Sequence, residues 1–470
     1  MQKFENYIGG AWVPAVTGET LDARNPADGQ VFAAFAASDA VDADHAVAAA
    51  RAAQPAWAEL PLDERLARIE AFADSIERRA EDIALAEHRE MGKPLGVALQ
   101  FISIGLAGFR AAVAQAREYA FTSRSEGAMG VTEVHRVPLG VVAEIVPWNF
   151  TVPQTLVNLG ALLAAGNTVV VKPSEKATPS AAVMFEDNPL PGGVLNLVLG
   201  DGRAGRALAE HPGIDLVVFT GSVATGRSVA RAAGENLNRT ILELGGKDAV
   251  IVDAGVDVGA VAMDVAAGSF INSGQICTSM ERIYVHEEIA EEFVAALLEA
   301  SKVFSAGGPM EIGPLVDEEQ AAIVEAHVAD AVARGAQVLT GGRDAGAAGS
   351  YFPPTVLTGI TPEMVIAREE TFGPVAPITV VDSFESALEL AGASDFGLAA
   401  TVYSADDAHL AAARTLAVSM LWLNRWQGSD GVRESEPAGI SGMGAVGGLR
   451  AYDAATRPMT VFLPHAELVG

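Results

Sequence analysis

Between residues 141 and 252 the chain alternates short apolar runs with helix-like segments, and this alternation restricts the fold more than any other feature. The apolar runs are Val141–Ile145, Thr168–Val171, Leu195–Leu199, Leu216–Phe219 and Ala249–Val252. Continuous apolar strands separated by helices are typical of a parallel sheet covered by helices on both faces. The sequence therefore predicts an α/β fold.

The alternation starts again after Asp253 and predicts a second α/β lobe. Helical patterns cover His286–Phe304 and Glu318–Arg334, following the upstream helical patterns of Asp42–Trp57 and Asp63–Met91. The strand-like runs of the second lobe are Gln337–Thr340, Pro377–Val381, Ala399–Tyr403 and Met420–Leu423. Because no Pro/Ser-rich linker separates the lobes, we expect them to share a broad interface with a ligand cleft.

The charge of the chain excludes one class of partner. There are 60 acidic and 31 basic residues, a net charge of −29, so a phosphate backbone or an anionic lipid surface would be repelled. We expect no nucleic acid and no membrane as partners. The single apolar stretch considered as a membrane span, residues 145–171, is interrupted by polar residues and prolines.

The cysteine and histidine content indicates the cellular compartment and whether a metal site is expected. One cysteine cannot form an intramolecular disulfide, and the first residues lack the basic start and apolar run of a secretory signal. The cytoplasm is therefore the expected location. The eight histidines are scattered without a metal-ligand spacing, so we predict no metal site.

Cys277 is the only cysteine, and it lies in a small, polar, glycine-containing stretch, Asn272–Arg282. A residue so placed is either a reactive nucleophile or a small buried apolar side chain, and the stretch alone does not decide between them.

Two glycine-containing stretches are candidate phosphate-binding loops. Residues 200–205 spell G-x-G-x-x-G after an apolar run, although no acidic residue follows at the spacing that would bind a ribose. The second candidate, Gly221 and Ser222, follows Phe219-Thr220 and opens a helix, where exposed N–H groups attract anions. The alternative for Ser222 is an ordinary helix cap, and both roles are compatible.

Four separated segments, with Cys277 between the last two, resemble the aldehyde dehydrogenase superfamily in order and spacing. They are Pro147-Trp148-Asn149-Phe150, Lys172-Pro173-Ser174-Glu175, Glu243-Leu244-Gly245-Gly246-Lys247 and Glu369-Glu370-Thr371-Phe372-Gly373-Pro374. The resemblance implies two α/β lobes, a Rossmann-like cofactor domain and a catalytic domain, with a small β oligomerisation arm. Residues 1–117 and 139–245 would bind NAD, 246–440 would form the catalytic domain, and 118–138 with 450–470 the arm.

The resemblance also implies a hydrolytic NAD-dependent aldehyde dehydrogenase that makes a carboxylic acid. Cys277 would form a thiohemiacetal and then a thioester, Asn149 would donate to the oxyanion, and Glu243 would activate the hydrolytic water. Apolar neighbours would raise the pKa of a buried Glu243 towards a useful range. The substrate would be a small-molecule aldehyde of unnamed identity, and the assembly a homodimer or homotetramer.

Cofactor binding is expected from residues that the resemblance assigns to one groove. A carboxylate at Glu175 would repel a 2′-phosphate, which favours NAD over NADP. Glu370 would hold the nicotinamide ribose and Phe372 would back the ring. The full expected set is Trp148, Lys172, Ser174, Glu175, Gly202, Gly221, Ser222, Leu244, Gly245, Glu370 and Phe372.

The chain also departs from the family pattern. Many members have a lysine where this chain has Asn158 and a Gly-Arg-Glu whose glutamate is replaced here by Val446, so the usual proton relay is absent. The helix after Pro179 is expected to be short, because Asp187-Asn188-Pro189 interrupts it. Two alternatives stay open: a coenzyme A-acylating semialdehyde dehydrogenase, or a catalytically impaired member acting as a binding protein.

Overall fold

The first lobe is built on an eight-stranded sheet, in a computed structural model that describes residues 1–343, 349–427 and 434–464. Its order is β23-β12-β11-β8-β9-β10-β2-β3, with five parallel central strands and antiparallel edges. Every apolar run predicted between residues 141 and 219 contains a strand of this sheet. The strands are β2 (Asn6–Ile8), β3 (Ala11–Val13), β8 (Val141–Val146), β9 (Thr168–Pro173), β10 (Leu195–Leu197), β11 (Leu216–Thr220), β12 (Arg239–Glu243) and β23 (Gly442–Met443).

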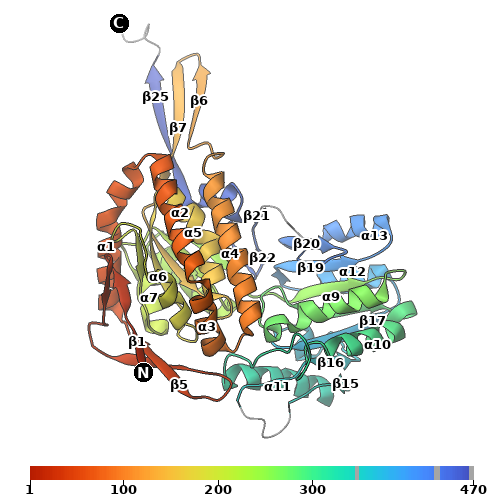
Figure 1. Cartoon of the computed structure of the whole chain (residues 1–470). Helices are drawn as coiled ribbons and strands as arrows, with labels where there is room; N and C mark the ends of the chain where they lie inside the picture. The colour runs from red at the N-terminus through yellow and green to blue at the C-terminus, as the bar shows by residue number, and fades with distance from the viewer. Residues whose placement is uncertain (344–348, 428–433, 465–470) are drawn as a thin grey trace.

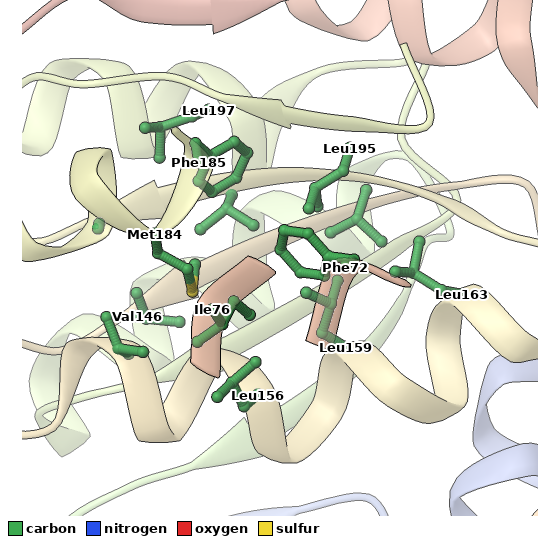
Figure 2. Packing of buried hydrophobic residues seen from close by; sticks show 14 of the residues in the cluster. Phe72, Ile76, Val146, Leu156, Leu159, Leu163, Met184, Phe185, Leu195 and Leu197 are labelled. Atoms are coloured by element: carbon green, nitrogen blue, oxygen red, sulfur yellow. The ribbon is translucent and has the colours of Figure 1, made fainter. Parts of the chain in front are cut away.

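Helices cover both faces of this sheet, as the alternation predicted. Val141, Ala143 and Ile145 pack towards one face, and Val142 and Val146 pack towards the other. The first face carries α1 (Ala40–Glu59), α7 (Gly202–Glu210) and α8 (Val223–Glu235). The second carries α2 (Leu62–Arg78), α3 (Ala80–Met91), α4 (Leu95–Gln115), α5 (Thr151–Ala164), α6 (Pro179–Phe185) and α14 (Arg450–Ala455). Figure 2 shows this second core, with Phe72 and Ile76 packed towards Leu156 and Leu159.

The second lobe contains a seven-stranded sheet in the order β15-β16-β17-β14-β13-β19-β20, parallel except at β15. It lies beside the first lobe, with α9 and α10 across one face (Figure 1). Its strands are β13 (Asp248–Val252), β14 (Met280–His286), β15 (Gln337–Thr340), β16 (Thr355–Thr358), β17 (Val375–Val381), β19 (Ala399–Tyr403) and β20 (Met420–Leu423). Its helices are α9 (Val258–Phe270), α10 (Ala290–Ser301), α11 (Glu318–Ala333), α12 (Phe384–Gly392) and α13 (Asp407–Ala412).

Two helix predictions need correction. The helix expected over His286–Phe304 begins only at Ala290, because His286 is the last residue of the central strand β14. The helical pattern over Asp63–Met91 is two helices, separated at Arg79, where φ is −107° and the helical hydrogen-bond ladder stops.

An antiparallel arm projects from the first lobe (Figure 1). It consists of β6 (Thr122–Gly127), β7 (Gly130–Pro138) and β25 (Thr456–Pro464), in the order β25-β7-β6. The hairpin and the C-terminal strand were both predicted, but here they pair within one chain. Residues 465–470, which the expected arm includes, lie outside the described residues. Smaller sheets join β1 (Gln2–Phe4), β5 (Val31–Ala36) and β4 (Thr20–Arg24), β18 (Phe396–Gly397) with β22 (Ala438–Gly439), and β21 (Glu434–Ser435) with β24 (Val446–Gly447).

By length and composition, α4 is the one helix in the described part of the chain that could cross a membrane. The sequence stretch considered for that role, residues 145–171, instead forms the end of β8, α5 and the start of β9. In the fold α4 packs on α5 through Ile102, Leu106 and Phe109, which lie on one helical face in the core of the first lobe.

Alanine substitutions at two glycines of α4 are expected to change the stability of the protein in opposite directions. A Cβ at Gly105 would lie 2.9 Å from Pro153 Cα on α5, whereas a Cβ at Gly108 would meet nothing within 4 Å. We expect Gly105→Ala to destabilise the protein by about 1–3 kcal/mol through overpacking. Gly108→Ala should stabilise it by up to about 1 kcal/mol, because alanine favours the helix. Thermal unfolding followed by circular dichroism checks both, and equal melting temperatures for the two variants would contradict the close packing of α4 on α5.

Candidate active site

Most of the predicted cofactor residues lie at the carboxyl edge of the first sheet. From β8 the chain proceeds to β9 and β10 on one side and returns to β11 and β12 on the other. In such a sheet ligands bind where the strand order reverses, beyond the carboxyl ends of the strands. The segments at this edge are Trp148-Asn149 after β8, Lys172–Glu175 at the end of β9, Gly221-Ser222 after β11 and Leu244-Gly245 after β12.

The amino edge of the second sheet faces this carboxyl edge, because β12 continues directly into β13. A Cβ at Gly245 would lie 2.3 Å from Glu370 Oε2, and one at Gly246 would lie 2.5 Å from the carbonyl oxygen of Cys277. A side chain at Gly246 would therefore require the Cys277 backbone to shift, whereas one at Gly245 would require the end of the Glu370 side chain to move. The amide of Gly246 donates to Glu370 Oε1 at 3.1 Å. The connection thus brings Gly245 and Gly246 against Glu370 and the Cys277 backbone.

The loop before Cys277 is held in an unusual conformation. Asn272 and Ser273 have φ values of 55° and 59°, and Gly274 follows with a φ of 69°. Left-handed backbone at residues other than glycine costs free energy and persists only where surrounding contacts fix it. Here the Gln275 side chain donates to Asn272 O at 3.1 Å and accepts from the amide of Val316 at 2.9 Å. These contacts determine where Cys277 lies.

Asn149 contacts this loop directly. Its side-chain Nδ2 donates to the carbonyl oxygen of Gln275 at 3.0 Å, which uses one of two amide hydrogens. Cys277 itself is partly exposed. On the other side, Thr278 accepts hydrogen bonds from Trp426 Nε1 at 3.2 Å and Gln427 Nε2 at 3.0 Å. The structure therefore brings the predicted oxyanion donor and the predicted nucleophile together.

Lys172 and Glu175 lie together, as predicted, with Lys172 Nζ 3.6 Å from Glu175 Oε2. Lys172 is almost fully buried, and burial lowers the pKa of its ammonium group, with Glu175 opposing that effect. Ser174 holds the turn after β9, where its amide donates to Val146 O at 3.0 Å. A buried cation beside a half-exposed carboxylate is suited to contacting hydroxyl groups of a ligand.

The two candidate phosphate loops both cap helices. Ser222 accepts from the amide of Thr225 at 3.3 Å at the start of α8. Gly202 is the first residue of α7, where Asp201 accepts from the amide of Arg203 at 2.9 Å. Asp201 therefore places a carboxylate where a phosphate would otherwise lie in the Gly200–Gly205 loop, which favours Gly221-Ser222 as the anion site.

Glu370 and Phe372 come from the segment before β17. Phe372 has a φ of 51° and packs edge-on against Trp148, with ring centroids 5.4 Å apart. Burial raises the pKa of Glu370 to about 8, with the negative charge of Glu281 adding to the effect. Trp148 from the first lobe and Phe372 from the second thus form one aromatic wall.

A buried ion pair that the sequence analysis missed supports this segment. Lys247 Nζ lies 2.6 Å from Glu281 Oε2, and both side chains are buried. The same carboxylate accepts the amides of Thr371 and Phe372, each at 2.8 Å. Lys247 was part of a recognised motif, but Glu281 lies in the polar sequence after Cys277, which gave no signal of a buried strand.

Comparison with known proteins agrees with this geometry. The model of the aldehyde dehydrogenase family matches residues 12–461. A mitochondrial aldehyde dehydrogenase of Leishmania tarentolae is 35% identical over 98% of this chain and 95% of its own length. The NADP/NAD-dependent aldehyde dehydrogenase PuuC of Escherichia coli is 39% identical over 85% of this chain and 83% of its own. The crystal structure of an NAD-dependent aldehyde dehydrogenase from Sinorhizobium meliloti superposes with a TM-score of 0.95 at 34% identity, covering 99% and 96% of the two chains.

The chain belongs to the aldehyde dehydrogenase family. The fold predicted from the resemblance, two α/β lobes, is confirmed by this match. As expected, α6 is short: it ends at Phe185, and Asp187 follows with a φ of 57°.

In this aldehyde dehydrogenase the two positions at which the usual relay residues are missing both lie in the core of the first lobe. Asn158 is a buried residue of α5, and Val446 is a buried apolar residue of β24 in the core that α5 helps to form. Both positions therefore carry uncharged side chains, in a core that also contains the buried carboxyl group of Glu144.

The Lys247–Glu281 pair yields a stability prediction. Glu281→Gln leaves the Lys247 ammonium buried without its counter-ion, which should destabilise the protein by about 3–5 kcal/mol. The double variant Lys247→Met/Glu281→Gln removes both charges and should recover most of that loss. Thermal melting of the three proteins checks this. A double variant no more stable than Glu281→Gln would show that the ion pair is not the main contribution.

Proposed function

We propose that this aldehyde dehydrogenase oxidises an aldehyde to a carboxylic acid with NAD through a thioester on Cys277. The observation that carries the proposal is the hydrogen bond from Asn149 to the loop of Cys277, close to the point where β12 ends at Glu243 and Gly246 lies against the Cys277 backbone. Nucleophile, oxyanion donor and general base come from separate segments, and each lies at this junction.

In the first step the Cys277 thiolate attacks the aldehyde carbon and a C–S bond forms. The carbonyl oxygen becomes an oxyanion, for which the second Asn149 hydrogen and the Cys277 amide are the donors. One such donor is typically worth roughly 3 kcal/mol in the transition state. A bound NAD would supply the acceptor for the hydride of that carbon, and the acyl group would remain on Cys277 as a thioester.

The second step is hydrolysis. Glu243 takes a proton from water, the water oxygen attacks the thioester carbon, and the C–S bond breaks to release the carboxylic acid and the thiolate. Glu243 ends β12 and is partly buried, so it is held at a strand end that opens on the junction. The presence of this carboxylate favours hydrolysis over transfer to coenzyme A.

The residues present fit NAD. The amino end of α8 at Ser222 suits the pyrophosphate, Lys172 and Glu175 suit the adenosine ribose, and Glu370 suits the nicotinamide ribose. The remaining expected contacts, Trp148, Ser174, Gly202, Gly221, Leu244, Gly245 and Phe372, lie along the same strand ends or face them. The Glu175 carboxylate favours NAD over NADP, although one relative is named for both cofactors.

We also infer the larger organisation. Residues 1–117 and 139–245 form the NAD-binding domain and 246–440 the catalytic domain, as the two sheets support. We propose a homodimer or homotetramer assembled through the arm, because Met459, Phe462 and Leu463 leave apolar surface exposed there. The net charge of −29 argues against nucleic acid and anionic membranes as partners, and we place the enzyme in the cytoplasm.

Two variants test the chemistry. With NAD and a panel of aliphatic and aromatic aldehydes, Cys277→Ala should form no NADH. Glu243→Gln should still form NADH in the first turnover but lose roughly 10²–10⁴-fold in steady-state turnover, since only hydrolysis needs the base. Absorbance of NADH and chromatography of the product check both. NADH production by Cys277→Ala at the parent rate, or an acyl-coenzyme A as the main product, would overturn the proposal.

A second experiment tests cofactor choice. Replacing the Glu175 carboxylate by an amide in Glu175→Gln removes the repulsion of a 2′-phosphate. We expect the ratio of kcat/KM for NADP to that for NAD to rise by about tenfold, equivalent to about 1.4 kcal/mol. Glu64→Gln, which removes one exposed negative charge from α2, is the control for net charge. If both variants shift the ratio equally, Glu175 does not set the preference.

A further inference from the structure

The turn between α3 and α4 contains a buried ion pair that the proposed reaction does not use. Lys93 follows Gly92, at which α3 ends with a φ of 74°. Its Nζ lies 2.8 Å from Glu87 Oε2, and both side chains are buried. The His88 ring donates from Nδ1 to the carbonyl oxygen of Lys93 at 2.8 Å. An apolar pair of similar size is often as stabilising as a buried ion pair, so stability alone does not explain these charges.

Lys93 contacts the residue that follows the proposed oxyanion donor. Its Nζ lies 4.4 Å from the centroid of the Phe150 ring, which is a cation–π contact removed from water. Phe101 of α4 packs on the same ring, with the two centroids 4.6 Å apart. Phe150 directly follows Asn149 and precedes the first residue of α5. The turn, with the helix that it leads into, therefore holds the ring next to Asn149.

The same turn contacts the second lobe. A Cβ at Gly92 would overlap the ring of Pro314, and a Cβ at Gly313 would overlap the carbonyl oxygen of Gly92. The backbone at residues 313–314 therefore lies directly against the end of α3, and any movement of one segment displaces the other.

Residues 313–316 are bonded in turn to the loop before Cys277. Ser273 Oγ donates to the carbonyl oxygen of Gly313 at 2.7 Å. The amide of Val316 donates to Gln275 Oε1 at 2.9 Å. Two hydrogen bonds therefore tie the segment that contacts the α3–α4 turn to the loop that carries the nucleophile.

The contacts form a closed series that begins and ends at Asn149. On one side Asn149 Nδ2 donates to the carbonyl oxygen of Gln275 at 3.0 Å, and on the other side its neighbour Phe150 lies against Lys93. A group that acts on a transition state must be held to within about 0.5 Å of its productive position. The α3–α4 turn is the one segment of this series that contacts both the Phe150 ring and the segment bonded to the Cys277 loop.

We propose that Lys93 is a positioning residue for the Asn149 amide. It acts through the Phe150 ring, and Glu87 is the counter-ion that allows its charge to be buried. Because Gly92 rests on the segment that holds the loop before the nucleophile, the turn sets the position of Asn149 relative to that loop. Removing the cation weakens the contact that holds the Phe150 ring, and Asn149 moves with its neighbour. This inference rests on the proposed role of Asn149 as the oxyanion donor.

The test removes both charges in Lys93→Met/Glu87→Gln, so that neither charge is left buried alone. With saturating NAD and a subsaturating aldehyde, NADH formation in a single turnover should slow by about tenfold, the size expected for a desolvated cation–π contact. In an Asn149→Ala background the same two changes should slow it by less than about twofold, because the group that they position is already absent. Stopped-flow absorbance of NADH measures all four proteins.

Glu90→Gln is the matched control. Glu90 is another buried acid of α3, and burial raises its pKa to about 8, so the amide resembles the neutral acid present at pH 7. Its carboxyl group accepts from the amide of Ser180 at 3.1 Å and no hydrogen bond joins it to Lys93 in the described part of the chain. Glu90→Gln should therefore leave the single-turnover rate unchanged.

Phe150→Leu is a second variant, which keeps both charges and removes the ring. It should slow the same step, and adding Lys93→Met/Glu87→Gln to it should cost less than about twofold more, because the two changes interrupt one contact. If Lys93→Met/Glu87→Gln does not fold, the effect of Phe150→Leu with and without Asn149→Ala decides the outcome.

The results separate the two proposals. Equal slowing by Lys93→Met/Glu87→Gln in the wild type and in Asn149→Ala would overturn the positioning role of Lys93, as would a parent rate in the wild-type background. If Asn149→Ala by itself forms NADH as fast as the wild type, Asn149 is not the oxyanion donor and the proposed function fails at that residue.

Discussion

The active site depends on the four-residue connection between β12 and β13, in which the chain leaves the carboxyl edge of one sheet and enters the amino edge of the other. The lack of space for a side chain at Gly246 is the physical reason that this connection is precise, because the Cys277 backbone occupies the volume that a Cβ would need. At Gly245 the same volume holds the end of the Glu370 side chain, so a larger residue there would displace that carboxylate.

The buried pair of Lys247 and Glu281 holds the segment that carries Glu370 and Phe372. Two charges taken out of water are weak support for stability unless their remaining hydrogen-bonding capacity is used. Glu281 uses it on the amides of Thr371 and Phe372, and Lys247 donates also to Thr371 Oγ1 at 3.2 Å. The pair therefore orients the segment of Glu370 and Phe372, and its negative charge contributes to the raised pKa of Glu370.

Much of the fold was predictable because apolar strands separated by helices leave a clear pattern. In the first lobe β8, β9, β10 and β11 followed it, but β12 was not predicted, and the run Ala249–Val252 of the same alternation proved to be β13 of the second sheet. In the second lobe β14 was missed, since Glu281 and Arg282 interrupt its apolar residues: their charges are satisfied within the fold by Lys247 and by backbone carbonyl groups, which no periodicity shows. Sequence motifs identified Cys277, Asn149 and Glu370. The positive φ angles of Asn272 and Ser273 and the anchoring by Gln275 could not be predicted, because they depend on contacts between residues distant in sequence.

The departure from the family pattern changes the charge inside the first lobe. Where the family pattern has a lysine and a glutamate, this chain has Asn158 and Val446, and both are buried neutral side chains. Glu144 of β8 is fully buried on the face of the sheet that α5 covers, and burial raises its pKa well above the ordinary value. The polar side chains of α5 and β11 on this face are neutral as well, and Gln154 donates to Thr220 Oγ1 at 3.2 Å. The loss of the charged pair therefore leaves neutral hydrogen-bonding groups where α5 packs on the sheet.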